Sequence, residues 1–399
     1  RAMEEKTKLF VKSRFKAYYS RAKIELPKDF WMREWGFVHF DQYFPTKLVM
    51  RRHKSFTTKD DLLSYLREDA PAHAYYSSAH YQYPAAAMAE KGWIGSDLIF
   101  DLDADHILSE AEFKRYAYEE LLERVKQETL KLIDFLINDF GFGEEDIKLV
   151  FSGSRGYHVH IKTAEVRGLG SRERREIVDY VMATGLEMDR FLVDGVKEKG
   201  YGGEKLGRGD LRLIPEGWGK RVLNGLIDFL HEIAAMEEER AIEVVKNVGE
   251  LERKKAQEII RIAKDETVMR RIEKGQIPRF AKPLWTVITR MATKIARVKS
   301  ADRPDEPVTA DIKRLIRLPT SLHGKSSLEV KPVRIETFEE FDPLEDAVIF
   351  GDSPVDIRVL RDSTITLKGE RYEVKAGELA SLPEHVALYF MCRGAAEIT

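Results

Sequence analysis

The sequence predicts a mixed fold of helices and strands, α/β or α+β, that a helical insertion interrupts. Segment Asp97–Asp103 alternates between polar and apolar residues as a strand does, and a helical stretch at 110–140 and a hairpin at 147–162 follow it. From about 171 to 297, charge-laced helical segments replace the strand signal. From about residue 350 the chain returns to short strands separated by turns. This order predicts a sheet with packed helices, a helical subdomain and a β-rich tail.

The acidic residues of the first strand are candidates for a cation site. Because side chains alternate along a strand, Asp97, Asp101 and Asp103 share the face opposite the apolar residues, and Asp105 continues the same parity. Neighbouring carboxylates repel each other unless a cation neutralises them, and their oxygens are the ligands that Mg²⁺ prefers. A bare Asp-x-Asp pattern is short, so a polar strand face that meets solvent is an equal alternative at this point.

The hairpin turn at residues 152–156 (Ser-Gly-Ser-Arg-Gly) has the composition of a phosphate site. Its glycines and serines, beginning with Ser152, offer backbone N–H groups to an anion, and Arg155 adds a charged donor. His158 and His160 then share one face of the following strand. An ordinary hairpin with half-exposed histidines is the alternative. A zinc site on these histidines is disfavoured because no cysteine lies near them.

The remaining elements follow from periodicity and turn residues. The helical stretch at 110–140 has apolar residues at helical spacing and stops at Gly141. In the insertion, residues 195–219 hold eight glycines with little periodicity, which predicts a loop. The charged run 236–264 predicts a solvated helical face rather than a binding tail. The tail is predicted to form strands at 355–361, 364–368 and 370–375 and a helix that begins near Leu382.

A third segment, residues 305–325, is dense in cationic side chains. The residues in it that can donate to phosphate are Arg314, Arg317, His323 and Lys325. Asp305, at the start of the segment, can complete a trio of carboxylates with Asp101 and Asp103. Taken alone, the segment is more typical of a basic helix on a protein surface.

Composition limits the class of protein. The 66 Lys and Arg residues nearly balance the 68 Asp and Glu residues, so only a local basic groove could bind nucleic acid. The single cysteine, Cys392, excludes an internal disulfide and a multi-cysteine zinc site. No apolar stretch reaches the length of a membrane span, and no secretory signal is recognisable. We therefore expect a cytoplasmic protein with no membrane partner.

Taken together, the three segments resemble the small, catalytic subunit of archaeal and eukaryotic primases. The matching pieces are Lys91–Asp105, Ser152–His160, Asp305–Lys325 with its Arg-Leu-Ile-Arg-Leu-Pro-x-Ser-Leu-His run, and Arg33–Phe37, which resembles the family's early Arg-Glu-aromatic motif. They occur in the family's order, and the resemblance spans roughly residues 20–165 and 300–330. The match is therefore more specific than a lone Asp-x-Asp pattern.

This resemblance implies roles for individual residues. The metal-binding catalytic residues would be Asp101, Asp103 and Asp305, which would hold two Mg²⁺ or Mn²⁺ ions. The nucleotide's phosphates would be bound by Ser152, Arg155, His158, Arg317 and His323, with Arg33 as a further phosphate contact. The implied activity is synthesis of short primers de novo on single-stranded DNA, from NTPs or dNTPs. The implied partner is an iron–sulfur-containing large subunit, in a heterodimer.

The fold class that the resemblance implies is α+β: a primase–polymerase core, made of an RRM-like sheet unit beside a second α/β unit. The predicted boundaries are 1–165 and 298–345 for the catalytic core, 166–297 for the helical insertion and 346–399 for a small β-rich C-terminal domain. That last domain resembles the small β domain of replisomal GINS proteins, which suggests docking to other replisome proteins. Two departures from the family pattern are the absence of Cys in 106–128, so that structural zinc is not supported, and Ser154 where some members carry a second arginine.

Three other functions compete with a primase. A repair or gap-filling polymerase of the same superfamily shares the chemistry and differs in template preference and de novo initiation. A haloacid-dehalogenase-like phosphatase also uses an Asp-x-Asp motif, but that class leaves segment 305–325 without a role. A non-catalytic scaffold could bind DNA through Arg314–Lys325, but the clustered carboxylates would repel phosphate unless a metal were bound.

Overall fold

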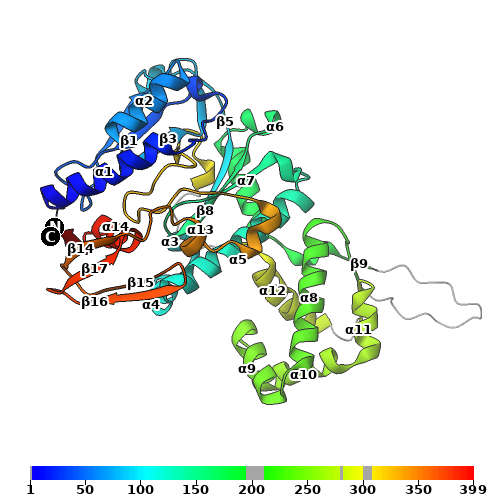
Figure 1. Ribbon diagram of the computed structural model, residues 1–399. Coiled ribbons are helices and arrows are strands. Elements are labelled where there is room, and N and C mark those ends of the chain that lie inside the picture. Colours follow the sequence, from blue (N-terminus) through cyan, green and yellow to red (C-terminus); the bar gives the residue numbers. More distant parts are fainter. Residues whose placement is uncertain (1, 195–210, 279–281, 300–307) are drawn as a thin grey trace, which may run out of the picture. The chain divides into compact units, whose positions relative to one another are not determined.

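The computed structural model describes residues 2–194, 211–278, 282–299 and 308–399 (Figure 1). The chain divides into two compact units, of which unit 1 comprises residues 1–178 and 300–399 and unit 2 comprises residues 179–299. Every strand pair among the described residues is antiparallel. Antiparallel sheets with separate helices define the α+β class rather than α/β, so the predicted fold class is confirmed.

The first predicted strand and the hairpin belong to one four-stranded sheet of unit 1, which we call the acidic sheet. Its order is β13 (Pro332–Val333), β7 (Ile147–Phe151), β8 (Gly156–Ile161) and β6 (Leu98–Asp103). Helix α5 (Tyr118–Asn138) contacts β6 and β8 and buries its apolar stripe, including Leu121, Val125 and Leu132. Burial of this stripe is the main source of stability for an amphipathic helix on a sheet.

A second four-stranded sheet of unit 1 carries the third motif. Its order is β12 (Leu315–Arg317), β3 (His73–Ser77), β1 (Trp35–Val38) and β2 (Met50–Lys54). Helices α1 (Glu5–Arg21) and α2 (Lys59–Asp69) contact each other, and Tyr65 of α2 packs against Phe37 of β1. The strands of this sheet bury aromatic side chains, among them Trp35, Phe37 and Tyr76. The hairpin of β4 (Ala79–Tyr81) and β5 (Trp93–Ser96) leads from this sheet into β6, and Asp97 N–H donates to Ser78 C=O at 2.9 Å.

The predicted helix at 110–140 is two helices, which corrects the sequence prediction. Helix α4 (Glu110–Arg115) starts at the capping residue Ser109, and α5 starts only at Tyr118. Between them Ala117 is extended (φ −64°, ψ 159°), and its N–H donates to the Glu120 carboxylate at 3.1 Å. A second helix cap in mid-sequence interrupts the helix while leaving the apolar periodicity intact. The other α-helices between residues 104 and 181 are α3 (Ala104–Ile107), α6 (Ala164–Arg167) and α7 (Ser171–Val181).

Unit 2 is mainly helical. Its helices are α8 (Gly217–Ala235), α9 (Glu238–Gly249), α10 (Arg253–Lys264), α11 (Glu266–Glu273) and α12 (Lys282–Ala296). The charged run 236–264 is helical, as predicted, and each of its two helices also buries an apolar stripe. The sequence missed a small sheet of β9 (Leu192–Asp194), β10 (Leu211–Leu213) and β11 (Gln276–Ile277), because two- and three-residue strands are too short to show a period. Of the predicted loop 195–219, residues 195–210 lie outside the described part, and the rest forms β10 and the start of α8.

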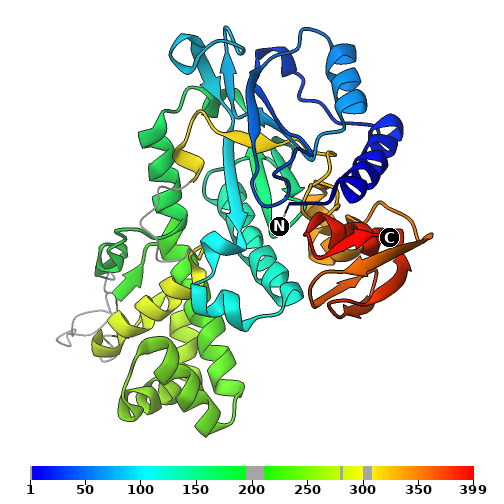
Figure 2. The ribbon, with the colours of Figure 1, turned by 90° about the vertical axis from the view of Figure 1, so that its left-hand side faces the viewer.

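The C-terminal segment contains the three predicted strands and two more. It comprises α13 (Pro343–Asp346), β14 (Pro354–Val359), β15 (Ser363–Leu367), β16 (Glu370–Val374), β17 (Leu379–Pro383), α14 (Glu384–Cys392) and β18 (Ala396–Ile398). The last helix begins at Glu384, after β17, and eight of its nine residues, all but Glu384, are buried. Ile398 N–H donates to Thr7 Oγ1 at 3.0 Å, so the N-terminal helix α1 lies beside the C-terminal strand β18 (Figures 1 and 2).

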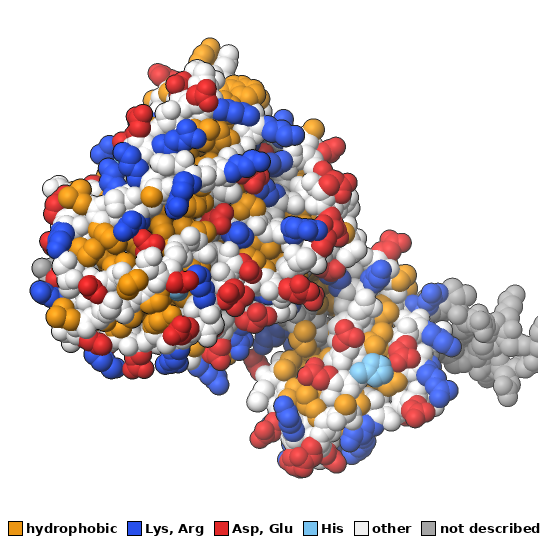
Figure 3. Space-filling view, viewed as in Figure 1, with side chains coloured by type: hydrophobic (Ala, Val, Ile, Leu, Met, Phe, Trp, Pro, Cys, Tyr) orange, Lys and Arg blue, Asp and Glu red, His pale blue; other side chains and the backbone are white. Residues whose placement is uncertain are grey.

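The surface carries charges of both signs, as the nearly equal numbers of basic and acidic residues predict. Acidic and basic side chains are interspersed on the face shown in Figure 3. Among the described residues, no helix is both long enough and apolar enough to cross a bilayer.

Candidate active site

Seven of the predicted site residues line one cavity in unit 1. The cavity has a volume of about 500 Å³ and lies at the end of β6 that carries Asp101 and Asp103. The predicted residues on its wall are Asp101, Asp103, Ser152, Arg155, His158, Arg317 and His323. The other basic residues on its wall are His73, Arg314, Lys325 and Arg393. Three segments far apart in the sequence thus meet around one cavity.

Antiparallel pairing places the turn at residues 152–156 beside the acidic strand. In the register of β6 and β8, Asp101 is opposite His158 and Asp103 is opposite Gly156. A Cβ atom at Gly156 would lie 2.0 Å from Leu102 O, so only glycine lets the two strands approach here. Gly153 has φ +85°, and a Cβ atom there would lie 2.6 Å from His323 Cβ. These glycines therefore allow the turn to approach both the acidic strand and the third motif.

The two carboxylates of the cavity are partly buried and only partly neutralised. The side chain of Asp101 is 11% exposed and that of Asp103 is 24% exposed. Asp101 forms an ion pair with Arg314, and Arg155 Nε lies 3.8 Å from Asp103. Burial raises the pKa of Asp103 above its ordinary value, and the charge of Arg155 opposes this shift. A carboxylate that is costly to keep charged, beside a second one on the same strand face, suits a divalent cation with oxygen ligands.

The third predicted ligand, Asp305, lies outside the described residues. Within the described ranges, no group of three or more His, Cys, Asp or Glu side chains is arranged to hold a metal ion. Asp105 follows the pair but does not line the cavity; it binds Arg155 Nη2 at 2.6 Å. Asp101 and Asp103 are therefore the described carboxylates that fit a cation at this cavity.

A cationic wall faces the carboxylates. Arg317 Nη1 donates to His73 Nδ1 at 2.7 Å, and the guanidinium lies 5.0 Å from the centre of the Tyr75 ring, which fixes its orientation. Burial lowers the pKa of Lys325, and the nearby charge of Arg155 lowers it further. Crowded cations of this kind are stabilised by an anion, and a triphosphate supplies several charged oxygens.

Sequence reasoning gave no role to two residues of this wall, His73 and Arg393. His73 lies between the motifs at Arg33–Phe37 and Lys91–Asp105 and becomes relevant only because β3 pairs with β12, whose Arg317 it binds. Arg393 follows α14 in the segment assigned to replisome docking. Neither residue has a local sequence signal, because each reaches the cavity through long-range packing.

The histidines at or near this cavity are buried and neutral. Burial is the main cause that lowers the pKa of His158 to about 4, although Asp101 opposes it. Burial also lowers the pKa of His73, His160 and His323 well below the ordinary value. His323 Nδ1 accepts a hydrogen bond from Lys325 N–H at 3.3 Å, so the neutral ring carries its proton on Nε2. Neutral His323 can therefore donate one hydrogen bond to a ligand in the cavity.

Acidification is expected to destabilise the chain through these histidines. A histidine with a lowered pKa in the folded state binds fewer protons when folded than when unfolded. The contribution of such a histidine to the free energy of unfolding is complete above the pKa of about 6.5 that it has in the unfolded chain. This contribution decreases as the pH falls toward the lower pKa of the folded state, by up to about 1.4 kcal/mol per pH unit for each histidine. The urea midpoint at pH 5 should be clearly lower than at pH 7.5.

The variant His160→Leu should reduce this pH dependence without destabilising the protein at pH 7.5. Both ring nitrogens of His160 are buried without a hydrogen-bond partner among the described residues, so an apolar side chain of similar size satisfies the site better. The control His231→Gln, at a position that is 58% exposed, should leave the pH dependence unchanged. If the urea midpoint of His160→Leu depends on pH as strongly as that of the wild-type chain, other groups cause the acid sensitivity.

Arg33, the remaining predicted phosphate contact, is not among the residues that line this cavity. Its side chain is 1% exposed, and Nη1 donates to the carbonyl oxygens of Ser77 and Ser78, each at 2.9 Å. Its other N–H groups bind the carboxylates of Asp29 and Asp97. Asp97, which shares strand parity with Asp101, is thus neutralised by Arg33. Because protein groups occupy all five N–H donors of Arg33, we leave it out of the phosphate-binding set proposed below.

Comparison with known proteins identifies the family. The sequence model of the DNA primase small subunit matches residues 100–335. The chain is 45% identical to the DNA primase small subunit PriS of Methanococcoides burtonii, and the match covers 99% of each chain. It is 44% identical to the DNA primase small subunit PriS of Methanocella arvoryzae, again over 99% of each chain. A family model that covers more than half of the sequence and full-length relatives at this identity agree: the chain belongs to the DNA primase small subunit family.

Proposed function

We propose that the chain synthesises short primers de novo on single-stranded DNA, by two-metal nucleotidyl transfer in the cavity of Asp101 and Asp103. The observation that carries this proposal is the division of charge in one cavity of about 500 Å³, with two carboxylates on one wall and five Arg and Lys side chains around them. A nucleoside triphosphate with its metal ions requires such an arrangement, because the carboxylates hold the cations and the basic groups hold the phosphates.

Different side chains would bind the metal ions and the phosphates. Asp101 and Asp103, with Asp305 as predicted from the sequence, would hold two Mg²⁺ or Mn²⁺ ions. When bound, these ions would activate the attacking 3′-hydroxyl and offset the charge of the leaving pyrophosphate. The residues proposed to bind the phosphates are Ser152, Arg155, His158, Arg317 and His323, together with Lys325 and Arg393. Held at fixed positions, these donors favour the transition state, in which charge on the phosphate oxygens grows.

We infer the partners from membership in the family. We propose a single-stranded DNA template, NTPs or dNTPs as substrates, and a heterodimer with an iron–sulfur-containing large subunit inside the cell. The C-terminal segment is proposed as a docking site for other replisome proteins. Arg393 of this segment also lines the cavity. The docking surface would therefore lie on other residues of the segment.

The deciding experiment is template-directed synthesis by the purified chain. Unprimed single-stranded DNA, labelled NTPs or dNTPs and Mg²⁺ or Mn²⁺ should give short products that disappear when the metal is chelated. Extension of an annealed primer, without products on unprimed template, would instead indicate a gap-filling polymerase. Phosphate release from a generic phosphomonoester without any synthesis would contradict the proposal and favour the phosphatase.

Arg393→Ala should raise KM for the incoming nucleotide by about 10- to 100-fold, because a charge-assisted hydrogen bond contributes about 1.5–3 kcal/mol. The kcat value should change less, since the carboxylates are untouched. Arg358→Ala is the matched control, because Arg358 lies in the same segment, is 59% exposed and is absent from the cavity wall. Steady-state kinetics on a primed template measure both values. An equal KM in the two variants would remove Arg393 from the site.

A further inference from the structure

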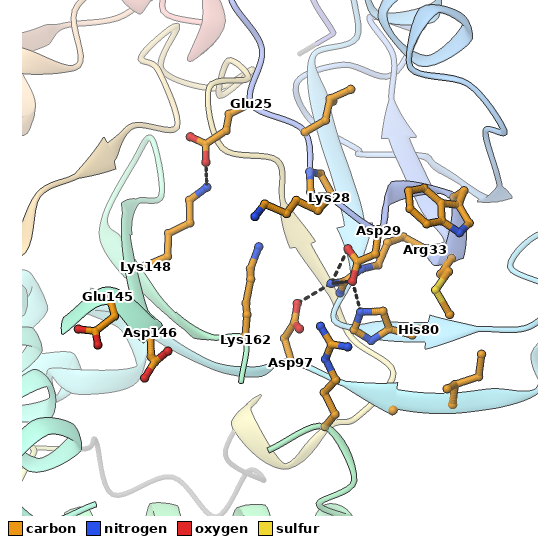
Figure 4. A pocket seen from close by; sticks show the side chains of 17 residues that line it. Glu25, Lys28, Asp29, Arg33, His80, Asp97, Glu145, Asp146, Lys148 and Lys162 are labelled. Atoms are coloured by element: carbon orange, nitrogen blue, oxygen red, sulfur yellow. Dashed lines mark hydrogen bonds and ion pairs between the residues drawn. The ribbon is translucent and has the colours of Figure 1, made fainter. Parts of the chain in front are cut away.

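Unit 1 has a second and larger cavity, of about 840 Å³, for which the proposed reaction gives no role (Figure 4). Its wall combines residues 25–33, the hairpin of β4 and β5, the start of β7 and the end of β8. The residues that matter for the argument are Lys28, Trp31, Ile94, Lys148, Lys162 and Arg167.

This second cavity lies on the same face of the acidic sheet as the active site. Asp97, on its wall, has the parity of Asp101 on β6, and Lys162 has the parity of His158 on β8. At about 3.3 Å per residue, Asp97 and Asp101 are separated by roughly 13 Å along the strand. Four stacked nucleotides at about 3.4 Å each span this distance, so one short stretch of a strand could reach both cavities.

Three cations of the second cavity have no carboxylate partner among the described residues: Lys28, Lys162 and Arg167. The other two are neutralised, since Lys148 binds Glu25 and Arg33 binds Asp29 and Asp97. Lys162 is half-buried, with Nζ 5.8 Å from the centre of the Tyr76 ring; burial lowers its pKa, and the charge of Asp97 opposes this shift. No carboxylate of the described residues forms an ion pair with this ammonium, so its charge is only partly compensated and favours a bound negative charge.

Lys28 and Lys162, which form no ion pair with a described carboxylate, lie close to each other. In Figure 4 the side chains of Lys28 and Lys162 point toward each other into the cavity, while Glu145 and Asp146 lie apart from them. Two ammonium groups that face each other repel unless an anion lies between them. A phosphate group fits this position, because it accepts from several N–H donors at once.

The rim of this cavity also offers apolar surface to a base. Trp31 is 52% exposed and Ile94 is 54% exposed, although both are large apolar side chains. Trp31 is held by the 3₁₀ helix Phe30–Met32, and its ring packs edge-on against Phe30. A supported aromatic ring beside unpaired cations is the combination that binds single-stranded nucleic acid, because bases stack on the ring while cations contact the backbone.

We propose that this second cavity binds the single-stranded DNA template, with a phosphate between Lys28 and Lys162 and a base on Trp31. The proposal rests on the proposed function, since it assigns the strand to the template that the active site copies. Arg167 adds a further backbone contact at the wall. A free nucleotide and an acidic peptide are the competing occupants that the test must separate.

The test is fluorescence anisotropy of a labelled 20-nucleotide oligo(dT) with the full chain. Lys28→Glu and Lys162→Met should each raise the Kd several-fold, and the double variant by tenfold or more. Each lost phosphate contact should also reduce the slope of log Kd against log[salt] by about 0.7. Trp31→Ala should raise the Kd about tenfold, and Trp31→Phe, which keeps an aromatic ring, by less. Lys59→Glu is the matched control, an exposed charge reversal in the first turn of α2 that lies outside both cavities.

The possible outcomes distinguish this inference from the proposed function. Weaker oligo(dT) binding in Lys28→Glu and Trp31→Ala, with the nucleotide KM on a primed template unchanged, supports a template site. Unchanged oligo(dT) binding in these variants overturns the inference even if the wild-type chain makes primers. Complete competition of the labelled oligonucleotide by dTTP or by a poly-glutamate peptide at similar concentration would also overturn it. Because Lys28 is exposed, its variant keeps the test decisive if Lys162→Met fails to fold.

Discussion

Replacing Asp101 or Asp103 with Asn is expected to lower kcat/KM for nucleotide addition by roughly a thousandfold or more. The amide keeps the shape of the side chain but removes the charge, so the proposed divalent cation would lose a ligand and the transition state would lose its largest electrostatic stabilisation. Both side chains are only partly buried, and Asn can still accept a hydrogen bond from Arg314 or Arg155. The thermal midpoint should therefore change little while synthesis is lost.

The control for this prediction is Asp105→Asn. Asp105 continues the same acidic run, but it binds Arg155 and does not line the cavity. Its loss should cost far less activity than loss of Asp101 or Asp103, in primer synthesis assays with Mg²⁺ and with Mn²⁺. Asp305→Asn, assayed in the same way, tests the ligand predicted from the sequence alone. Substantial activity in Asp103→Asn, or equal losses in Asp105→Asn and Asp103→Asn, would contradict the assignment of the metal ligands.

Replacing Arg33 with Leu is expected to destabilise unit 1 by about 3–5 kcal/mol, the usual cost of leaving a buried charge without its partner. Asp97 is completely buried, and Arg33 Nη2 lies 2.8 Å from its carboxylate. Arg33 also binds Asp29 and the carbonyl oxygens of Ser77 and Ser78, at the point where the chain leaves β3 for the β4–β5 hairpin. Loss of Arg33 therefore removes a connection between the second sheet and the residue that precedes β6.

A double-mutant cycle isolates the pair. Arg33→Leu/Asp97→Leu should be considerably more stable than the sum of the two single losses predicts, because the double variant buries no unpaired charge at position 97. Lys114→Met is the surface control, since Lys114 and its partner Glu110 are 73% and 72% exposed, and it should change stability little. Urea denaturation followed by tryptophan fluorescence gives the free energies of unfolding. A loss for Arg33→Leu as small as that of the control would show that this buried pair does not hold the fold together.

The sequence by itself determined the longer elements and the family. Strand β7 and the β6 strand of alternating residues were predictable because five or more residues show a period, and the long apolar stripe of α5 was predictable for the same reason. The motifs around Asp101, Arg155 and Arg317 were sufficient to suggest the family, since they combine opposite charges in a fixed order. The domain boundaries, the roles of the site residues and the metal ions remain predictions.

Only the tertiary structure decided which charged residues act together. Asp97 and Asp101 have the same strand parity, yet Asp97 is buried against Arg33 while Asp101 faces the cavity. Strand β12 brings Arg317 to the cavity of Asp101 and Asp103 by pairing with β3, more than two hundred residues earlier in the chain. Local periodicity records which face of an element is apolar, but not which distant element covers that face. The partners of a charged side chain are therefore fixed by long-range pairing and packing, whose signal is spread over the whole chain.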